Sequence, residues 1–119
     1  MLGLPTSVRI YLADEPTDMR RGFDGLSRMV EQQGLDLYSG HLFVFLSRRR
    51  DRVKVLTWER GGLVLYYKRL EKGRFRRPRR SNDGRYLLLD AGQLAMLVDG
   101  VDWQRAKRVR VWQPRKTAS

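Results

Sequence analysis

Two β-rich runs separated by a short glycine-containing turn constrain the fold of this chain more than any other feature. The runs 52–58 and 63–70 are rich in valine, leucine and tyrosine, and Glu59-Arg60-Gly61-Gly62 lies between them. Such a pattern is typical of a β-hairpin, in which the glycines supply the positive φ angles of the turn. We therefore expect an antiparallel pair of strands over residues 52–70.

A hairpin loop with an even number of residues assigns every side chain to one of two faces. One face then carries Lys54, Leu56, Trp58, Leu63, Leu65, Tyr67 and Arg69, and the other carries Val53, Val55, Thr57, Val64, Tyr66 and Lys68. Both faces are apolar near the turn and charged at the open end. Because residues 48–50 enter at the open end and residues 72–74 leave from it, we expect one strongly basic pole of the sheet.

Periodic segments elsewhere predict further strands and two helices. Strands are expected over 8–12, 42–46 and 85–89, with a final edge strand over 109–112. A helix is expected over 20–33 from the helical spacing of Phe23, Leu26, Met29 and Val30, with residues 14–18 capping its start and Gly34 its end. A short helix is expected over 91–98, with Asp90 as its N-cap and Gly100 as its end.

Together these elements predict a single α+β domain over residues 1–119. A mainly antiparallel sheet, with the hairpin 52–70 at its centre, is expected to pack against one longer and one short helix. Residues 72–80 cannot form a central strand, because their charges repel and Pro78 lacks a backbone donor. Together with residues 81–84 they are expected to form an exposed basic arm, and residues 113–119 a flexible tail.

The distribution of charge is the strongest indication of function. The 119 residues include 25 lysines and arginines against 13 acidic residues, which gives a net charge of +12. Residues 40–80 alone hold 14 basic and 3 acidic residues, a net charge of +11. A concentrated positive surface attracts polyanions, and nucleic acid is the common polyanion of the cytoplasm. A solvated basic surface without a specific partner is the alternative.

The predicted nucleic-acid contacts are the cations of this region and one aromatic ring among them. They are Arg48, Arg49, Arg50, Arg52, Lys54, Lys68, Arg69, Lys72, Arg74, Phe75, Arg76, Arg77, Arg79 and Arg80. Arginine pairs with phosphate in a bidentate geometry. Phe75 is expected to be exposed among its charged neighbours, where it can stack on an unpaired base. In contrast, Phe43, Phe45, Trp58 and Tyr67 are expected in the core.

The residue inventory argues against enzyme chemistry. The chain has no cysteine and one histidine, which excludes disulfides, thiolate nucleophiles and multi-histidine metal sites. His41 begins a buried strand, where a lone histidine is usually structural. Asp18, Asp24 and Asp51 are the candidates for a metal-dependent nuclease, but helix capping and ion pairing with arginine explain them as well. We therefore predict a non-catalytic protein with no cofactor and no bound metal.

The sequence also predicts a cytoplasmic protein with no membrane association. Residues 1–5 lack both the basic region and the long apolar core of a signal peptide. No apolar run approaches the roughly 20 residues that a membrane-spanning helix needs.

Four sequence words resemble a known family. They are residues 17–26, residues 40–52, Trp58 with residues 66–75, and residues 93–103. Together they resemble the TnpB accessory proteins encoded by the second open reading frame of insertion sequences of family sixty-six, which are distinct from the RNA-guided nuclease of the same name. The most specific word is the nine-residue run Tyr67-Lys68-Arg69-Leu70-Glu71-Lys72-Gly73-Arg74-Phe75.

The resemblance implies participation in transposition beside a separate, larger transposase that carries the acidic catalytic triad. It supplies no catalytic residue to assign to this chain. We therefore predict an accessory protein, associated with the bacterial nucleoid, that contacts transposon ends through the basic pole and arm and assists the transposase. The alternative is an adaptor that docks the transposase through an acidic-to-neutral helix face and the Asp102-Trp103 region, without contacting DNA.

Overall fold

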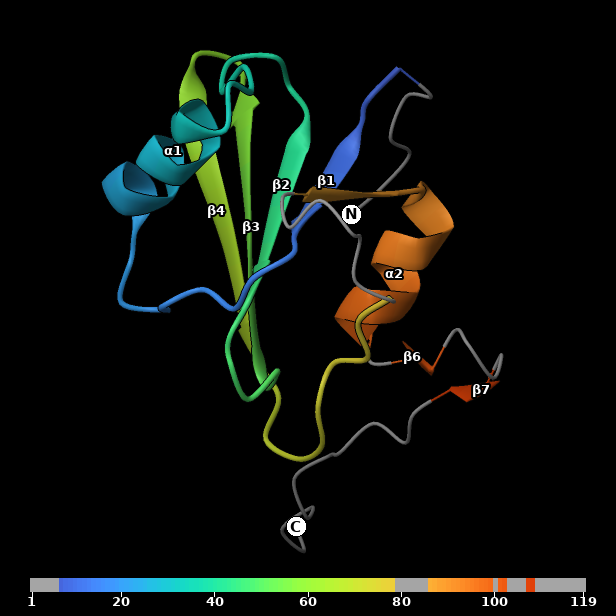
Figure 1. Ribbon diagram of the computed structural model, residues 1–119. Coiled ribbons are helices and arrows are strands. Elements are labelled where there is room, and N and C mark those ends of the chain that lie inside the picture. The colour runs from blue at the N-terminus through green and yellow to red at the C-terminus, as the bar shows by residue number, and fades with distance from the viewer. Residues whose placement is uncertain (1–6, 79–85, 100, 103–106, 109–119) are drawn as a thin grey trace, which may run out of the picture.

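A five-stranded sheet organises the protein, in the order β4-β3-β2-β1-β5 (Figure 1). The computed structural model describes residues 7–78, 86–99, 101–102 and 107–108. The strands are β1 (Ile10–Ala13), β2 (Leu42–Leu46), β3 (Arg52–Glu59), β4 (Gly62–Arg69) and β5 (Tyr86–Leu89). β1 and β2 run parallel, whereas the other neighbouring pairs are antiparallel. The predicted α+β class with a mainly antiparallel sheet is confirmed.

The centre of the sheet is β2 rather than the hairpin. All five residues of β2 are buried, as its continuous apolar sequence predicts. The hairpin of β3 and β4 forms one side of the sheet, and β4 is an edge strand. The prediction of a central hairpin was wrong because β1 pairs with the free side of β2 and extends the sheet away from the hairpin. An edge position also keeps the polar side chains of β4 accessible to water.

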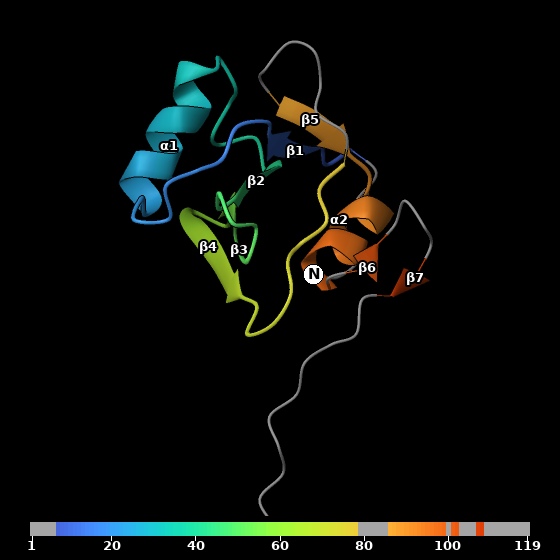
Figure 2. The same cartoon turned by 60° about the horizontal axis from the view of Figure 1, so that its bottom comes forward.

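The two helices cover opposite faces of the sheet (Figures 1 and 2). Alternate side chains of β2 point to opposite faces and belong to two separate apolar clusters. Phe43 and Phe45 pack with Leu26 and Val30 of α1 (Phe23–Gln32), and Leu42, Val44 and Leu46 pack with Leu94, Leu97 and Val98 of α2 (Ala91–Asp99). Full burial of each such side chain contributes about 1.5–3 kcal/mol, so this packing is what holds both helices on the sheet.

Helix α1 begins three residues later than predicted. Its N-cap is Gly22, which has no side chain to bond the first turn, so residues 14–18 do not cap the helix. Phe23, expected on the buried face, is 46% exposed because the helix contacts the sheet through Leu26 and Val30. The end is as predicted, since Gly34 takes a φ of +75° and its N–H donates to the Glu31 carbonyl oxygen.

Helix α2 confirms the predicted cap. The Asp90 carboxylate accepts a hydrogen bond from the Gln93 N–H at 2.7 Å, and the Gln93 side-chain oxygen accepts one from the Asp90 N–H at 2.9 Å. This reciprocal pair is a capping box. Two short strands follow, β6 (Val101–Asp102) and β7 (Lys107–Arg108), which pair with each other. The predicted strand 109–112, the tail 113–119 and the helix stop Gly100 lie outside the described residues.

The hairpin turn has two central residues, as an even loop requires. Arg60 and Gly61 take φ values of 48° and 86°, the signature of a type I′ turn. The assignment of positive φ is therefore right for Gly61 and wrong for Gly62, which begins β4. The register pairs Trp58 with Leu63 and Lys54 with Tyr67, so both predicted faces of the hairpin are confirmed.

The segment after β4 is not the exposed arm that the sequence predicted. Phe75 is fully buried in the cluster beneath α2, and Pro78 is buried as well. Arg74 and Arg76 are exposed, so side chains alternate between core and water as in an extended chain. The prediction failed because the charged neighbours of Phe75 point away from the sheet and do not oppose burial of the ring. Residues 79–84 of the predicted arm lie outside the described part of the chain.

Candidate nucleic-acid interface

Two segments distant in sequence are joined at the open end of the hairpin. The turn between β2 and β3 is closed by a hydrogen bond from the Ser47 N–H to the Arg52 carbonyl oxygen, and Arg50 in this turn takes a φ of 59°. The segment after β4 bonds to this turn through the Leu70 N–H, which donates to Asp51 at 2.7 Å, and the Phe75 N–H, which donates to Arg50 at 2.6 Å. These bonds bring residues 48–52 and 69–76 together.

A third segment, the loop before α1, adds a cation that the sequence did not predict for this end. An open groove of about 400 Å³, here called the turn groove, is lined by Thr17, Asp18, Met19, Arg20, Ser47, Arg48, Arg49, Asp51 and Arg52. The side chain of Arg20 is 92% exposed. The groove therefore joins the arginines of the turn to Arg20 from the loop before α1.

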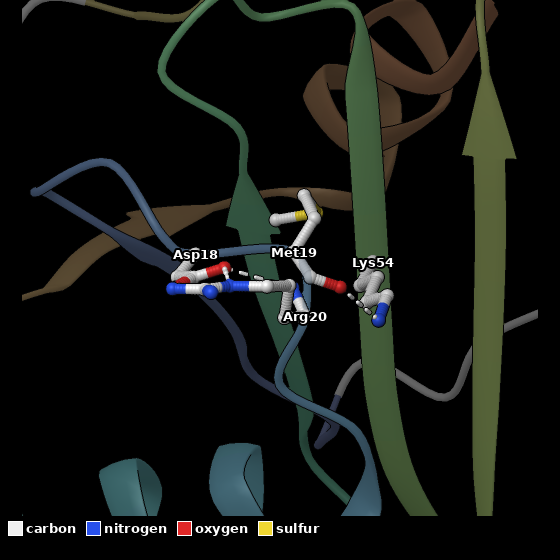
Figure 3. Close-up of polar contacts among 4 residues, drawn as sticks. All are labelled: Asp18, Met19, Arg20 and Lys54. Atoms are coloured by element: carbon white, nitrogen blue, oxygen red, sulfur yellow. Dashed lines mark hydrogen bonds and ion pairs between the residues drawn. The ribbon is translucent and has the colours of Figure 1, made fainter.

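The negative charge of Asp18 in the turn groove is paired with the guanidinium of Arg20. Its carboxylate accepts hydrogen bonds from the guanidinium of Arg20, the shortest at 2.7 Å, and another from the Arg20 backbone N–H (Figure 3). These bonds lower the pKa of Asp18 to about 2. The pair folds the loop into a compact turn, in which Asp18 orients the one cation that this loop contributes to the groove.

A second groove lies beside the first on the α1 side of the hairpin. This strand groove, of about 520 Å³, is lined by Arg52, Tyr67, Arg69 and Glu71. Arg69 donates to Glu71 at 2.8 Å, and this hydrogen bond raises the pKa of the Arg69 guanidinium above its usual value. Arg52 lines both grooves, and its Nε atom is buried without a hydrogen-bond partner in the described residues. The grooves therefore meet at Arg52.

Lys54, predicted to contact nucleic acid, is instead a structural residue. Its side chain is buried, and Nζ donates to the carbonyl oxygens of Met19 at 2.8 Å and Arg21 at 2.7 Å. Figure 3 shows the Met19 carbonyl directed at Lys54. The ammonium also lies 4.6 Å from the centroid of the Tyr67 ring. Lys54 thus attaches the loop before α1 to the sheet and is not available to a phosphate.

Three other predicted site residues are also used within the fold. Lys68 donates from Nζ to the Val98 carbonyl oxygen at 2.9 Å, near the end of α2. Arg77 forms an ion pair of 2.9 Å with the buried Asp14. Phe75 is fully buried and cannot stack on a base. Arg79 and Arg80 lie outside the described residues.

Among the described residues, the predicted cations that remain accessible form, together with Arg20, a smaller basic set, which we call the basic end. It comprises Arg20, Arg48, Arg49, Arg50, Arg52, Arg69, Lys72, Arg74 and Arg76, of which Arg50 and Arg52 are half-buried and the rest exposed. These nine cations share their surroundings with three acidic residues, Asp18, Asp51 and Glu71. The local excess of positive charge is therefore six.

The sequence profile of the family described as "IS66 Orf2 like protein" matches residues 8–108. The chain belongs to this family. Two proteins of Sinorhizobium fredii (strain NGR234) are similar to it over nearly their whole lengths. The uncharacterized protein y4jC is 40% identical over 99% of this chain and 100% of its own, and the uncharacterized protein y4hO is 37% identical over 98% of each. No solved structure matches the chain significantly.

Proteins of the IS66 Orf2-like family are accessory proteins of insertion sequences, which assigns this chain to transposition. Two of the four sequence words that resemble the family, residues 17–26 and 40–52, meet in the turn groove. Asp18-Met19-Arg20 line it from one side and Arg48, Arg49 and Asp51 from the other. The sequence left open whether residues 18–23 are functional or form a capped helix entrance, and the structural role was slightly favoured.

Two of the remaining polar candidates of this IS66 Orf2-like protein, His41 and Asp51, are occupied by protein contacts. His41 Nδ1 accepts a hydrogen bond from the Arg9 N–H at 3.0 Å, a structural role. Asp51, predicted to pair with arginine, accepts a hydrogen bond from the Ser47 hydroxyl at 3.1 Å. Among the described residues, no three histidine or acidic side chains are grouped to hold a metal ion. No helix in the same part of the chain is long and apolar enough to cross a membrane.

Proposed function

We propose that this protein is a non-catalytic transposition accessory protein that binds DNA through its basic end and assists the separate transposase at the transposon ends. The observation that carries the proposal is the convergence of the basic end from three segments: the loop before α1, the turn between β2 and β3, and residues 69–76. Family membership supplies the transposition context, in which DNA is the substrate. We expect the protein to act on the bacterial nucleoid.

The chemistry of the basic end suits the sugar–phosphate backbone. Eight of its nine cations are arginines, whose planar guanidinium groups match the geometry of phosphate oxygens. The cations are presented by turns and strand ends, not by a helix, so backbone contacts rather than major-groove readout are expected. Arg79 and Arg80 follow in the sequence and stay predicted contacts, although they lie outside the described residues.

The proposal is tested by fluorescence anisotropy with labelled terminal-repeat DNA and a scrambled duplex of equal length, across a series of salt concentrations. Each lost phosphate contact lowers the magnitude of the log–log salt slope by about 0.9 for duplex DNA. We expect the double variant Arg48→Ala, Arg49→Ala to lower the magnitude of the salt slope by about 0.9 for each of the two lost contacts. Preference for the terminal repeat would identify a site-recognising subunit.

A matched control separates local contacts from overall charge. Arg28 on α1 and Arg60 at the hairpin turn are exposed arginines outside the basic end, so the variant Arg28→Ala, Arg60→Ala removes the same charge. This variant should bind DNA with an unchanged salt slope. Equal weakening by both double variants, or no binding by the unaltered protein at low salt, would contradict the proposal.

A second candidate function is a protein adaptor that docks the transposase without contacting DNA. Exposed apolar side chains favour it, because Phe23 on α1 is 46% exposed and Leu88 on the edge strand β5 is 57% exposed. The other predicted docking element is Asp102-Trp103, and Trp103 lies outside the described part of the chain. Co-purification of the cognate transposase after nuclease treatment, lost in the variant Phe23→Ser, would favour the adaptor.

A further inference from the structure

We infer that the strand groove holds an unpaired DNA base stacked on the ring of Tyr67, so that the protein recognises single-stranded segments of its DNA. The inference rests on the proposed DNA-binding function and specifies which form of DNA the basic end takes. Three features of the groove carry it: the exposed ring of Tyr67, the two arginines beside it, and the Lys54 ammonium that lies over the ring.

Tyr67 has the exposure and position that a stacking residue needs. The residue is 51% exposed, although it lies on the same face of the hairpin as the buried Lys54 and Leu56. It lines the strand groove together with Arg52 and Arg69. From the sequence we expected Tyr67 in the core and Phe75 as the stacking ring, and the structure reverses these two positions.

The Tyr67 ring is held in place before any ligand arrives. Lys54 Nζ lies 4.6 Å from its centroid, and two backbone carbonyl oxygens of the loop before α1 fix that ammonium. A fixed ring loses little conformational freedom when a base stacks on it. The exposed side of the ring remains for a base, whose π-face stacks on an aromatic ring without regard to sequence.

The cations around the ring provide a path for the phosphates on either side of such a base. Arg52 and Arg69 are cross-strand partners beside Tyr67, and Arg52 continues into the turn groove with Arg48 and Arg49. Arg52 as a whole is half-buried, so part of its side chain is accessible from the grooves that it lines. In a duplex the bases are stacked inside and cannot reach a ring on a sheet surface, so this geometry favours an unpaired strand.

The test compares single-stranded and duplex DNA of one terminal-repeat sequence, using an oligonucleotide with a fluorescent adenine analogue that is quenched when it stacks. We expect the unaltered protein to quench the single strand. The variant Tyr67→Leu, which keeps an apolar cover over Lys54, should bind the single strand roughly 5- to 100-fold more weakly and abolish quenching. Its salt slope and its duplex affinity should stay unchanged, because no phosphate contact is removed.

Two further variants control this experiment. Tyr67→Phe keeps the ring and should retain affinity and quenching, whereas Tyr66→Leu alters the neighbouring tyrosine on the opposite face and should have no effect. Equal affinity of Tyr67→Leu and the unaltered protein for the single strand would overturn the inference while leaving duplex binding, and the proposed function, intact. Absence of binding to either DNA would overturn both. Tighter binding of an RNA strand of the same sequence would overturn the assignment to DNA.

Discussion

Arg77 and Asp14 lie 63 positions apart in the sequence and form an ion pair of 2.9 Å between Nη2 and Oδ1. The side chain of Asp14 is 1% exposed and that of Arg77 is 14% exposed. A second nitrogen of Arg77 donates to the Asp14 carbonyl oxygen. These bonds attach the segment after β4 to the end of β1, and thereby hold Phe75 in the core.

Replacing Arg77 should therefore destabilise the fold and not merely remove a surface charge. Arg77→Ala takes the guanidinium partner from a buried carboxylate, which costs about 2–3 kcal/mol of the free energy of unfolding. Urea denaturation followed by circular dichroism measures this loss. The exposed neighbour variant Arg76→Ala should change the free energy of unfolding by less than about 0.5 kcal/mol. A loss of similar size in both variants would contradict the structural role of the pair.

Lys54 and Arg48 should behave in opposite ways when each is changed to methionine. Lys54→Met leaves the carbonyl oxygens of Met19 and Arg21 without their donor and should cost about 1–3 kcal/mol of stability. Arg48→Met should leave stability unchanged and reduce the magnitude of the DNA salt slope by about 0.9. Denaturation and anisotropy measured on both variants check the assignment. A changed slope in Lys54→Met with unchanged stability would show that Lys54 contacts DNA after all.

The hairpin turn contains a residue, Arg60, whose replacement should stabilise the fold. Arg60 takes a φ of 48°, a left-handed conformation that costs an ordinary side chain about 1–2 kcal/mol and that asparagine tolerates. Because Asn-Gly is the preferred pair for a type I′ turn, Arg60→Asn should raise the free energy of unfolding by about 0.5–1 kcal/mol. Arg60→Lys keeps the charge and should have no effect. A decrease in the thermal midpoint of Arg60→Asn would contradict the turn type.

The Asp18–Arg20 pair should be visible in a carboxyl titration. The pKa of Asp18 falls from its usual 3.8 to about 2 through hydrogen bonds to Arg20. Because the folded-state pKa is lowered, the contribution of this carboxylate is present above about pH 4 and disappears as the pH falls through about 2. NMR titration should place the Asp18 midpoint near 2, and Arg20→Ala should return it towards 3.8. An unchanged midpoint in Arg20→Ala would exclude the pair in solution.

Much of the local structure follows from patterns within short stretches of sequence. The alternation in residues 52–70 predicts which side chains share a face, because the strand period of two admits only two assignments once the loop is even. The cap of α2 follows from Asp90 and Gln93 three positions apart, and the end of α1 follows from Gly34, whose φ of +75° suits glycine. Each of these features depends on neighbours only a few residues away. Family membership was likewise readable from contiguous words.

The composition of the site depends on contacts between distant segments. Charge counting located the basic region but could not tell that Lys54, Lys68 and Arg77 are used by the fold, because their partners lie at least 30 positions away. For the same reason Phe75 is buried and Tyr67 is exposed, which is the reverse of what the sequence predicted. Whether an aromatic ring is buried or exposed depends on which segment crosses it, and local charge carries no information about that. Tertiary packing alone placed Arg20 beside Arg48 and left the ring of Tyr67 open to solvent.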